Sequence, residues 1–261
     1  GRDSALVSFY LREGGMANVQ AKRGCPHRCV YCTYPCLEGR TYRFRPAGDV
    51  VDEIEMLRDR HGVDYLSFTD SVFNDAEGRY LEIAEEMVRR ETRVPWMAFF
   101  RPARFGADEA TLLARSGLRC VEWGTDCASD ATLTAMGKAF GWAEVVQSNR
   151  LFAEAGIANG HFVIFGGPGE TRDTVAEGLA NLDALQDAVV FVFRGVRILP
   201  GTEMERIARR EGVLAEGTDL FEPVFYFSPE VDAAWLDAEL RRGFAGRRDR
   251  VYSSNPDDDL R

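Results

Sequence analysis

The segment Cys25-Pro26-His27-Arg28-Cys29-Val30-Tyr31-Cys32 places three cysteines in one loop, spaced four and then three residues apart. This spacing lets three thiolates converge on one metal centre. Iron–sulfur clusters are held by cysteine thiolates on short spacers of this kind. Three protein ligands on a four-iron cluster leave one iron open, so the segment predicts a metal centre with an exchangeable position.

The other three cysteines help to decide the kind of site. Cys36 closely follows the loop, whereas Cys120 and Cys127 stand apart. Clustered cysteines in a long, non-secreted chain indicate metal binding or redox chemistry rather than a disulfide framework. Structural zinc is the alternative, with Cys36 or His27 as the fourth ligand. Zinc sites more often combine two separate cysteine pairs, which this chain lacks, so a cluster is favoured and Cys36 is expected to be a free thiol.

The composition is that of a globular protein and not of a nucleic-acid coat. The 261 residues are 45% hydrophobic and carry a net charge of −10, and this length suits one α/β barrel. Non-specific binding to duplex phosphate needs a surplus of positive charge, so Arg40, Arg43 and Arg45 are interpreted as a solvated face. Neither a signal peptide nor an apolar stretch near 18 residues is present, which predicts a cytoplasmic protein without a membrane span.

Short apolar runs alternate with segments of helical period from Met16 onward. This alternation predicts a parallel sheet with helices outside it. Six strand–helix units rather than eight favour an α/β fold, a partial (βα)6 TIM-like barrel that is open along one side. The expected strands are 17–22, 65–68, 95–100, 119–123, 161–165 and one within 189–199; the expected helices are 49–60, 77–90, 108–116, 130–136, 142–155, 172–186 and 202–210.

Three regions are expected along the chain. Residues 1–15 form a lead-in, interpreted as a linker from an upstream domain because the chain begins with Gly1 and not with Met. Residues 16–212 form the barrel. Residues 213–261 form an extension with an aromatic run and a helix over 231–243, which either closes the open edge of the barrel or contributes to a substrate pocket.

Several polar positions fall at the ends of predicted strands, where the chemistry of parallel barrels is located. Asp70 and Ser71 follow the second strand and offer acceptor oxygens, although Ser71 equally suits an N-cap of the next helix. Glu122 lies inside the fourth strand, where a carboxylate is costly unless it is paired, so it is expected to face the pocket. The turn at Gly166, Gly167, Pro168 and Gly169 lets a backbone approach a ligand closely.

The loop, with an aromatic residue just before its last cysteine, resembles the cluster loop of radical S-adenosylmethionine enzymes. A subgroup usually fused to a cobalamin-binding domain is the most similar. The stretches that carry this resemblance are 15–16, 23–26, 33–35, 38–40, Asp70-Ser71-Val72-Phe73-Asn74, 166–171 and Arg197-Ile198-Leu199-Pro200. Together they span roughly residues 14 to 230.

The resemblance implies a radical SAM barrel in which Cys25, Cys29 and Cys32 hold a [4Fe-4S] cluster. S-adenosylmethionine would bind the open iron, and one electron from a donor such as flavodoxin or ferredoxin would split it into methionine and a 5′-deoxyadenosyl radical. The residues implied to contact this cofactor are Tyr31, Asp70 and Ser71 near the ammonium, Glu122 near the ribose or methionine part, Lys138 near the carboxylate, and Ile164, Gly166, Gly167, Pro168 and Ile198 near the adenine.

The substrate and reaction type stay open at this point. A small-molecule or lipid-like organic substrate is expected, with C-methylation through cobalamin as the leading subtype. The cobalamin signature Asp-x-His-x-x-Gly is absent, and Asp59-Arg60-His61-Gly62 does not fit it, so cobalamin would come from a domain outside these residues or the enzyme performs another radical rearrangement or oxidation. An inert zinc or iron–sulfur module is the non-enzymatic alternative. Cys127 is either a hydrogen donor or, as favoured, a small loop residue.

Overall fold

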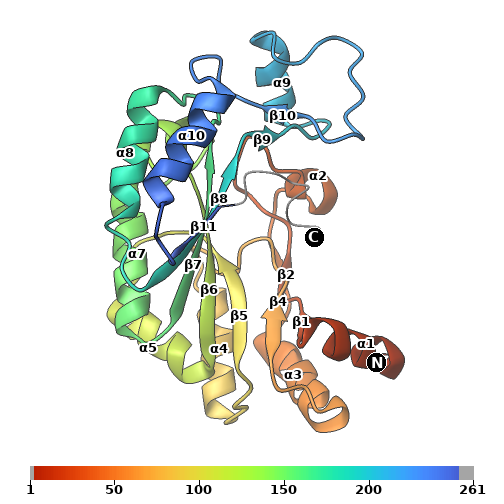
Figure 1. Cartoon of the computed structure of the whole chain (residues 1–261). Helices are drawn as coiled ribbons and strands as arrows, with labels where there is room; N and C mark the ends of the chain where they lie inside the picture. The colour runs from red at the N-terminus through yellow and green to blue at the C-terminus, as the bar shows by residue number, and fades with distance from the viewer. Residues whose placement is uncertain (1–2, 253–261) are drawn as a thin grey trace.

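A parallel sheet of seven strands runs through residues 3–252, the part of the chain that the computed structural model describes (Figure 1). Its strand order is β1-β4-β5-β6-β7-β8-β11, and every neighbouring pair is parallel. The strands are β1 (Ala17–Val19), β4 (Leu66–Phe68), β5 (Trp96–Phe100), β6 (Leu118–Asp126), β7 (Ala158–Phe165), β8 (Ala188–Arg194) and β11 (Arg250–Tyr252). Two short antiparallel pairs accompany the sheet, β2 (Lys22–Arg23) with β3 (Arg43–Phe44) and β9 (Val196–Arg197) with β10 (Phe225–Tyr226).

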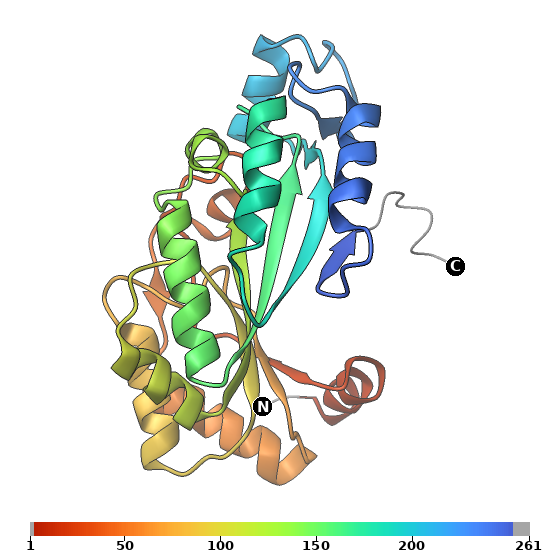
Figure 2. The same cartoon turned by 60° about the vertical axis from the view of Figure 1, so that its left-hand side comes forward.

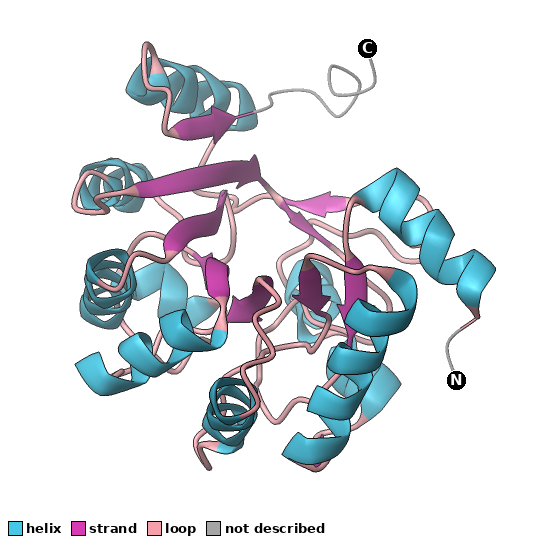
Figure 3. Ribbon diagram, turned by 90° about the horizontal axis from the view of Figure 1, so that it is seen from below, coloured by secondary structure: helices cyan, strands magenta, loops and turns pink. Residues whose placement is uncertain are grey.

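Helices cover the convex side of this curved sheet. Each parallel connection must return over a face of the sheet, and it does so through a helix. Viewed from below, the strands form an arc with the helices outside it (Figure 3), and the turned view in Figure 2 shows helices packed along the later strands of the sheet. The helices are α1 (Ser4–Gly14), α2 (Tyr34–Glu38), α3 (Ala47–His61), α4 (Arg79–Arg89), α5 (Ala107–Ser116), α6 (Asp130–Ala135), α7 (Trp142–Glu154), α8 (Arg172–Leu182), α9 (Glu203–Arg210) and α10 (Ala233–Phe244). No helix of residues 3–252 is long and apolar enough to cross a bilayer.

The main core lies between the sheet and these helices. Alternate residues of β5 point to opposite faces, so Trp96, Ala98 and Phe100 are buried whereas Phe99 is 44% exposed. Phe100 packs edge to face on Trp123 of β6, with ring centroids 5.9 Å apart. Trp123 in turn contacts Phe152 of α7 at 4.9 Å. The outer face of the sheet therefore carries the densest packing.

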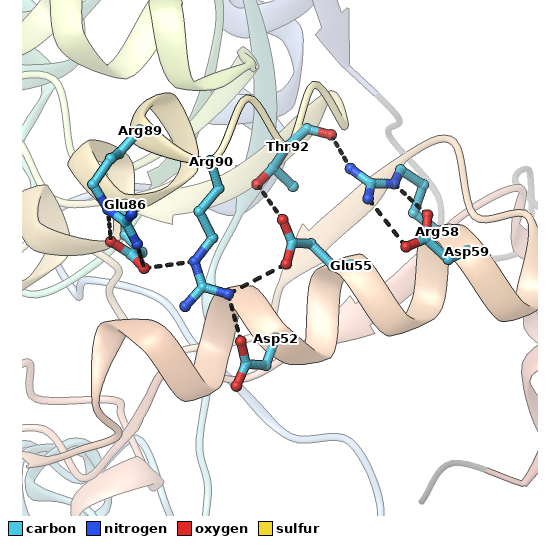
Figure 4. A network of polar contacts seen from close by, with 8 residues as sticks. All are labelled: Asp52, Glu55, Arg58, Asp59, Glu86, Arg89, Arg90 and Thr92. Carbon is cyan, nitrogen blue, oxygen red and sulfur yellow. Dashed lines mark hydrogen bonds and ion pairs between the residues drawn. The ribbon is translucent and has the colours of Figure 1, made fainter.

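An ion-pair network joins helix α3 to the C-terminal end of α4 (Figure 4), far from the C-terminal ends of the strands. The Arg90 guanidinium contacts Glu86 at 2.6 Å and Glu55 at 3.2 Å, and it also pairs with Asp52. Arg58 donates to the Thr92 carbonyl at 2.8 Å. Exposed pairs of this type contribute about 0–1 kcal/mol each, so the network orients the two helices more than it stabilises them.

The predicted parallel barrel is confirmed, with all six expected strands in chain order. Two expected strands are interrupted, because 17–22 contains only β1 and the start of β2 while 189–199 divides into β8 and β9. A seventh strand, β11, was not predicted, since three residues are too few to show an alternating pattern. It pairs with β8 and belongs to the C-terminal extension. The proposed domain boundaries stay predictions, and residues 253–261 of that extension lie outside the described residues.

Candidate active site

The cysteine loop begins directly after β2 of the short β2–β3 hairpin, at the C-terminal ends of the strands of the main sheet. Gly24 precedes it with φ +88°, and a Cβ at this position would stand 2.1 Å from the Thr41 carbonyl oxygen. Only glycine fits such a left-handed, crowded position. The Cys25 amide donates to Gly39 at 3.0 Å, and the Cys32 amide donates to Cys29 at 3.2 Å. The hairpin thereby closes the loop into a compact turn.

Two neighbouring segments fix the middle of the loop. The Val30 amide donates to the Met136 carbonyl at 3.1 Å, and the Met204 amide donates to the Val30 carbonyl at 2.8 Å. Gly137 adopts φ +74°, and a Cβ there would lie 2.4 Å from the Arg28 carbonyl oxygen. The loop is thus held between the end of α6 and the start of α9.

Three thiols share one pocket at this position. Cys25, Cys29 and Cys32 line a cavity of about 240 Å³ together with residues from the ends of β4, β5, β6 and β7. Burial raises the pKa of Cys32, a nearby Tyr34 amide opposes this, and the adjacent Cys29 and Cys25 raise it further. Cys36 is exposed and lies outside this cavity, and its role as a free thiol stays a prediction.

The donor set suits a cluster better than a single ion. Among residues 3–252, no three His, Cys, Asp or Glu side chains are close enough to hold one metal ion. Thiolates on one zinc ion lie about 2.3 Å from it, hence within about 4.6 Å of each other. Thiolates of an iron–sulfur cluster bind different iron atoms and can stand further apart. That Cys25, Cys29 and Cys32 hold an iron–sulfur cluster stays a prediction from their spacing.

A buried ion pair borders the same cavity. Lys138 pairs with Asp126, and its ammonium also donates to the Tyr31 hydroxyl at 3.3 Å. The Tyr31 hydroxyl donates to Asp126. Burial lowers the pKa of Lys138, but the adjacent Asp126 carboxylate outweighs burial, and the net pKa is raised. Burial, with Asp126, raises the pKa of Tyr31 well above its usual value, so the phenol stays protonated and donates to Asp126.

The local shape of β6 creates this arrangement. The pairing of β6 with β7 slips between Trp123 and Asp126, and Asp126 has φ +62°. A non-glycine residue in this region costs about 1–3 kcal/mol and persists only where its surroundings enforce it. Here the Asp126 carboxylate pairs with the Lys138 ammonium and accepts a hydrogen bond from the Tyr31 hydroxyl. Tyr31 and Lys138, two residues implied by resemblance, therefore meet through a third residue that was not predicted.

The Asp70 and Ser71 positions have different surroundings. The buried Asp70 carboxylate accepts the backbone amides of Ala21, at 3.2 Å, and Lys22, at 2.5 Å. Burial raises its pKa to about 6. Ser71 lines the cysteine cavity and donates to the Gly24 carbonyl at 3.2 Å. Its alternative role as a helix N-cap is wrong, because α4 is preceded by Gly78.

Glu122 lies on the concave face of the sheet, away from the cavity lining. It is half-buried, and burial raises its pKa. Its charge acts on Tyr65 and Cys120, which lie toward the opposite end of the strands. A contact between Glu122 and the cofactor stays a prediction.

The glycine-rich turn packs against the C-terminal extension. Gly166 has φ +85°, donates to the Glu170 carboxylate at 3.0 Å and accepts the Ser228 amide at 2.9 Å. A Cβ on Gly167 would lie 3.2 Å from Val196. Gly166 and Gly167 do not line the cysteine cavity. Pro168 is buried and does not line it either. Their predicted contact with adenine stays untested.

Ile164, Ile198 and Cys127 belong to one apolar cluster beneath the loop. Ile198 is fully buried, and Ile164 packs against the cluster from its edge. Cys127 is 2% exposed, and burial raises the pKa of its thiol. This placement suits the small packing residue favoured from the sequence and gives the thiol no access to the cysteine cavity, whose lining excludes it.

The cavity lining includes residues that were not among the predicted site residues, among them Phe99, Arg101, Asp126 and Phe162. The Arg101 guanidinium lies 5.0 Å from the centre of the Phe140 ring, and burial lowers its pKa against the opposing effect of Cys29. His27 also lines the cavity, and burial lowers its pKa to about 4, so it is neutral at neutral pH. Phe99, Arg101 and Asp126 stand at the C-terminal end of a predicted strand or just beyond it, which was the available signal, whereas Phe162 lies near the start of the strand predicted over 161–165.

The chain matches proteins of one family. The model of the Radical SAM superfamily matches residues 19–180. Tryptophan 2-C-methyltransferase of Streptomyces laurentii is 29% identical over 205 residues, which are 73% of this chain and 34% of that protein. Anaerobic magnesium-protoporphyrin IX monomethyl ester cyclase of Cereibacter sphaeroides is 32% identical over 159 residues, which are 59% of this chain and 26% of that protein.

A solved structure shares the fold over almost the whole chain. The radical S-adenosylmethionine methyltransferase TsrM from Kitasatospora setae, determined with cobalamin and a [4Fe-4S] cluster bound, aligns with a TM-score of 0.83 and 27% identity. The alignment covers 95% of this chain and 57% of that one. The chain thus spans less than two thirds of each relative's length. The family match over residues 19–180 agrees with the cysteine loop and the parallel sheet, and the chain belongs to the radical SAM superfamily.

Proposed function

We propose that this chain is the core of an enzyme that binds a [4Fe-4S] cluster through Cys25, Cys29 and Cys32 and S-adenosylmethionine beside it. The observation that carries the proposal is the single cavity lined by these three thiols and by the Lys138–Asp126 pair. When bound, the cluster supplies one electron for reductive cleavage of the sulfonium. Transfer of a methyl group to carbon through cobalamin is the proposed subtype.

The side chains around the thiols have separate tasks in this proposal. Thiolates and a bound cofactor carboxylate bring negative charge, and Lys138 and Arg101 provide nearby positive charge. Tyr31, tied to Asp126, positions the segment between Cys29 and Cys32. Phe99 and Phe162 form an apolar wall with ring centroids 6.3 Å apart. Such a wall excludes water, which strengthens electrostatic interactions within the site.

The subtype rests on the relatives. A tryptophan methyltransferase and TsrM, whose structure contains cobalamin, support methylation with an organic substrate. The cyclase relative keeps a second candidate, a radical oxidation or rearrangement without methyl transfer. A small-molecule substrate and an electron-donor protein belong to both candidates.

Anaerobic reconstitution with iron and sulfide tests the proposal. We expect about four irons per chain, a brown colour from the cluster, and release of 5′-deoxyadenosine on addition of reductant and S-adenosylmethionine. Cys29→Ala should abolish both iron uptake and product, whereas Cys36→Ala, which changes an exposed cysteine outside the cavity, should retain them. Colourless protein with one bound zinc would contradict the proposal, and a loaded but inactive cluster would favour an inert module.

The subtype needs a separate readout. With methyl-labelled S-adenosylmethionine, hydroxocobalamin and a reductant that converts it to cob(I)alamin, methyl transfer by a protein that includes the expected cobalamin-binding domain predicts labelled methylcobalamin. Release of 5′-deoxyadenosine without any labelled methylcobalamin would favour the second candidate.

A further inference from the structure

The outer side of the cysteine loop is basic although the chain as a whole is acidic. Residues 22–45 hold six basic side chains and one acidic side chain, a net charge of +5, in a chain whose net charge is −10. Four of these arginines are exposed, namely Arg23, Arg28, Arg40 and Arg43. The positive charge is thus concentrated around the candidate cluster site.

A second cavity opens on this outer side. It measures about 540 Å³, and its lining includes Arg28, Cys29, Cys32, Cys36 and Arg40. Cys29 and Cys32 also line the inner cavity. These two cysteines therefore stand between the inner cavity and the outer surface.

Two of the arginines keep their charge available to a partner. Within residues 3–252, the guanidinium groups of Arg28 and Arg40 make no hydrogen bond or ion pair. Arg45, by contrast, is committed to Glu53 at 2.6 Å. Unpaired exposed arginines on a surface create a local positive potential that steers an acidic partner.

Helix α2, which lies between Arg28 and Arg40 in the chain, carries exposed apolar side chains, of which Tyr34 also borders the inner cavity. Tyr34 and Leu37 are 42% and 78% exposed on helix α2, and their spacing of three residues places them on one helix face. Interfaces are enriched in tyrosine and arginine, and exposed apolar groups surrounded by polar ones mark contact sites. The patch is small, as is usual for the transient complexes of electron transfer.

We infer that this patch, defined as Arg28, Tyr34, Leu37 and Arg40, is the docking surface for an acidic one-electron donor protein. The inference rests on the proposed cluster. One electron leaves the reduced donor and enters the oxidised cluster, and no proton moves or bond changes in this step. A nucleic acid is the less suitable occupant, because an apolar residue as exposed as Leu37 gains nothing against phosphate and the chain outside the loop is acidic.

Stopped-flow reduction by a reduced acidic [2Fe–2S] ferredoxin tests the docking surface. Arg28→Glu/Arg40→Glu should lower the second-order rate of cluster reduction about 10-fold or more at low salt, since like charges slow the encounter. Arg115→Glu/Arg119→Glu is the matched control, because these exposed arginines lie near the start of β6, at the other end of the strand. Dithionite should reduce all variants at equal rates.

Salt dependence gives a second readout. The wild-type rate should fall as ionic strength rises from 0.01 M to 0.15 M, where the Debye length shrinks from about 30 Å to about 8 Å. The patch variant should change little. If Arg28→Glu disturbs the loop and lowers iron content, Arg40→Glu/Leu37→Ser reports on the same surface from outside the cysteine motif.

Binding to the metal-free chain separates this inference from the proposed function. Calorimetric titration with the oxidised ferredoxin should show binding that the patch variants weaken and the control does not. Equal rates and equal binding for patch and control variants would overturn the inference. The same titration with a poly(U) oligomer tests the nucleic-acid alternative. If the patch variants lost poly(U) binding but bound ferredoxin like the wild type, the inference would also be overturned. Failure of wild-type protein to take up iron overturns the proposed function, and the calorimetric result then still decides the docking surface.

Discussion

Phe99 and Phe100 are neighbours in one strand, yet they belong to two different regions of the molecule. Phe100 is 1% exposed on the convex, helix-covered face of the sheet, where it contacts Trp123 and Phe152. Phe99 is 44% exposed on the concave face; both residues border the cysteine cavity, but Phe99 alone of the two is exposed. The same side chain thus serves stability on one face and the site on the other.

The concave face carries more apolar surface than a solvated face needs. Phe162 stacks on Phe191 and Phe193, with ring planes 16° and 13° apart, and Phe193 is 49% exposed. Exposed apolar surface of this kind marks a place where a ligand or partner binds. The comparison teaches that the convex face determines whether the chain folds, whereas the concave face is reserved for binding.

The Lys138–Asp126 pair lies where the two faces of the sheet meet, so a substitution there should affect both the stability of the fold and the site. Lys138→Met would leave Asp126 buried without its cation, a change that costs about 3–5 kcal/mol, and it should also reduce iron uptake because the Tyr31 hydroxyl loses its hydrogen bond from Lys138. Urea unfolding and the iron content after reconstitution measure the two effects. In the double variant Lys138→Met/Asp126→Asn, part of the stability should return. A single variant as stable as the wild type would show that the pair contributes nothing to folding.

A truncation on the convex face should affect stability alone. Phe100→Ala removes a ring that is buried among five other aromatic rings, and such changes cost about 3–5 kcal/mol. Denaturant unfolding of the metal-free protein measures this loss. At temperatures where the variant remains folded, iron uptake should equal that of the wild type; reduced uptake by a fully folded variant would contradict the separation of the faces.

The buried Asp70 carboxyl should make the free energy of unfolding depend on pH. Its pKa in the folded state is raised to about 6, above the ordinary value of about 3.8. The folded state therefore binds the proton more tightly, and this stabilisation is complete below about pH 4 and is lost as the pH rises through 6. The change amounts to at most about 3 kcal/mol.

Unfolding of the metal-free protein between pH 4 and pH 7 measures this dependence. Asp70→Asn should remove the decline, whereas Asp64→Asn, at an exposed position, should retain it. An unchanged pH profile in Asp70→Asn would assign the decline to another group.

The smallest effect on stability is expected at Phe99. Phe99→Ala removes a ring that is almost half exposed, so the loss should stay below about 1 kcal/mol. Binding of S-adenosylmethionine to the reconstituted protein should nevertheless weaken, since the ring lines the cavity. A stability loss as large as that of Phe100→Ala would remove the distinction between the two faces.

Much of this architecture could be predicted because it depends on patterns among residues that are close together in the sequence. Six strands and seven helices of the barrel follow from apolar periodicity, and the three cluster cysteines follow from their spacing. The strand β11 was missed because three residues carry no period. The surroundings of Asp70 were missed because its acceptor role is filled by the backbone of Ala21 and Lys22, about 50 residues earlier in the chain.

By itself, the sequence determined which residues can hold a metal centre and at which end of the sheet they stand. Only the tertiary structure decided which other side chains meet them. Tyr31 lies 95 residues before Asp126, and Lys138 reaches both because β6 slips its register and turns Asp126 inward at a positive φ. Such contacts depend on how strands and loops are placed in three dimensions, whereas a ligand spacing within one loop depends only on the neighbouring residues.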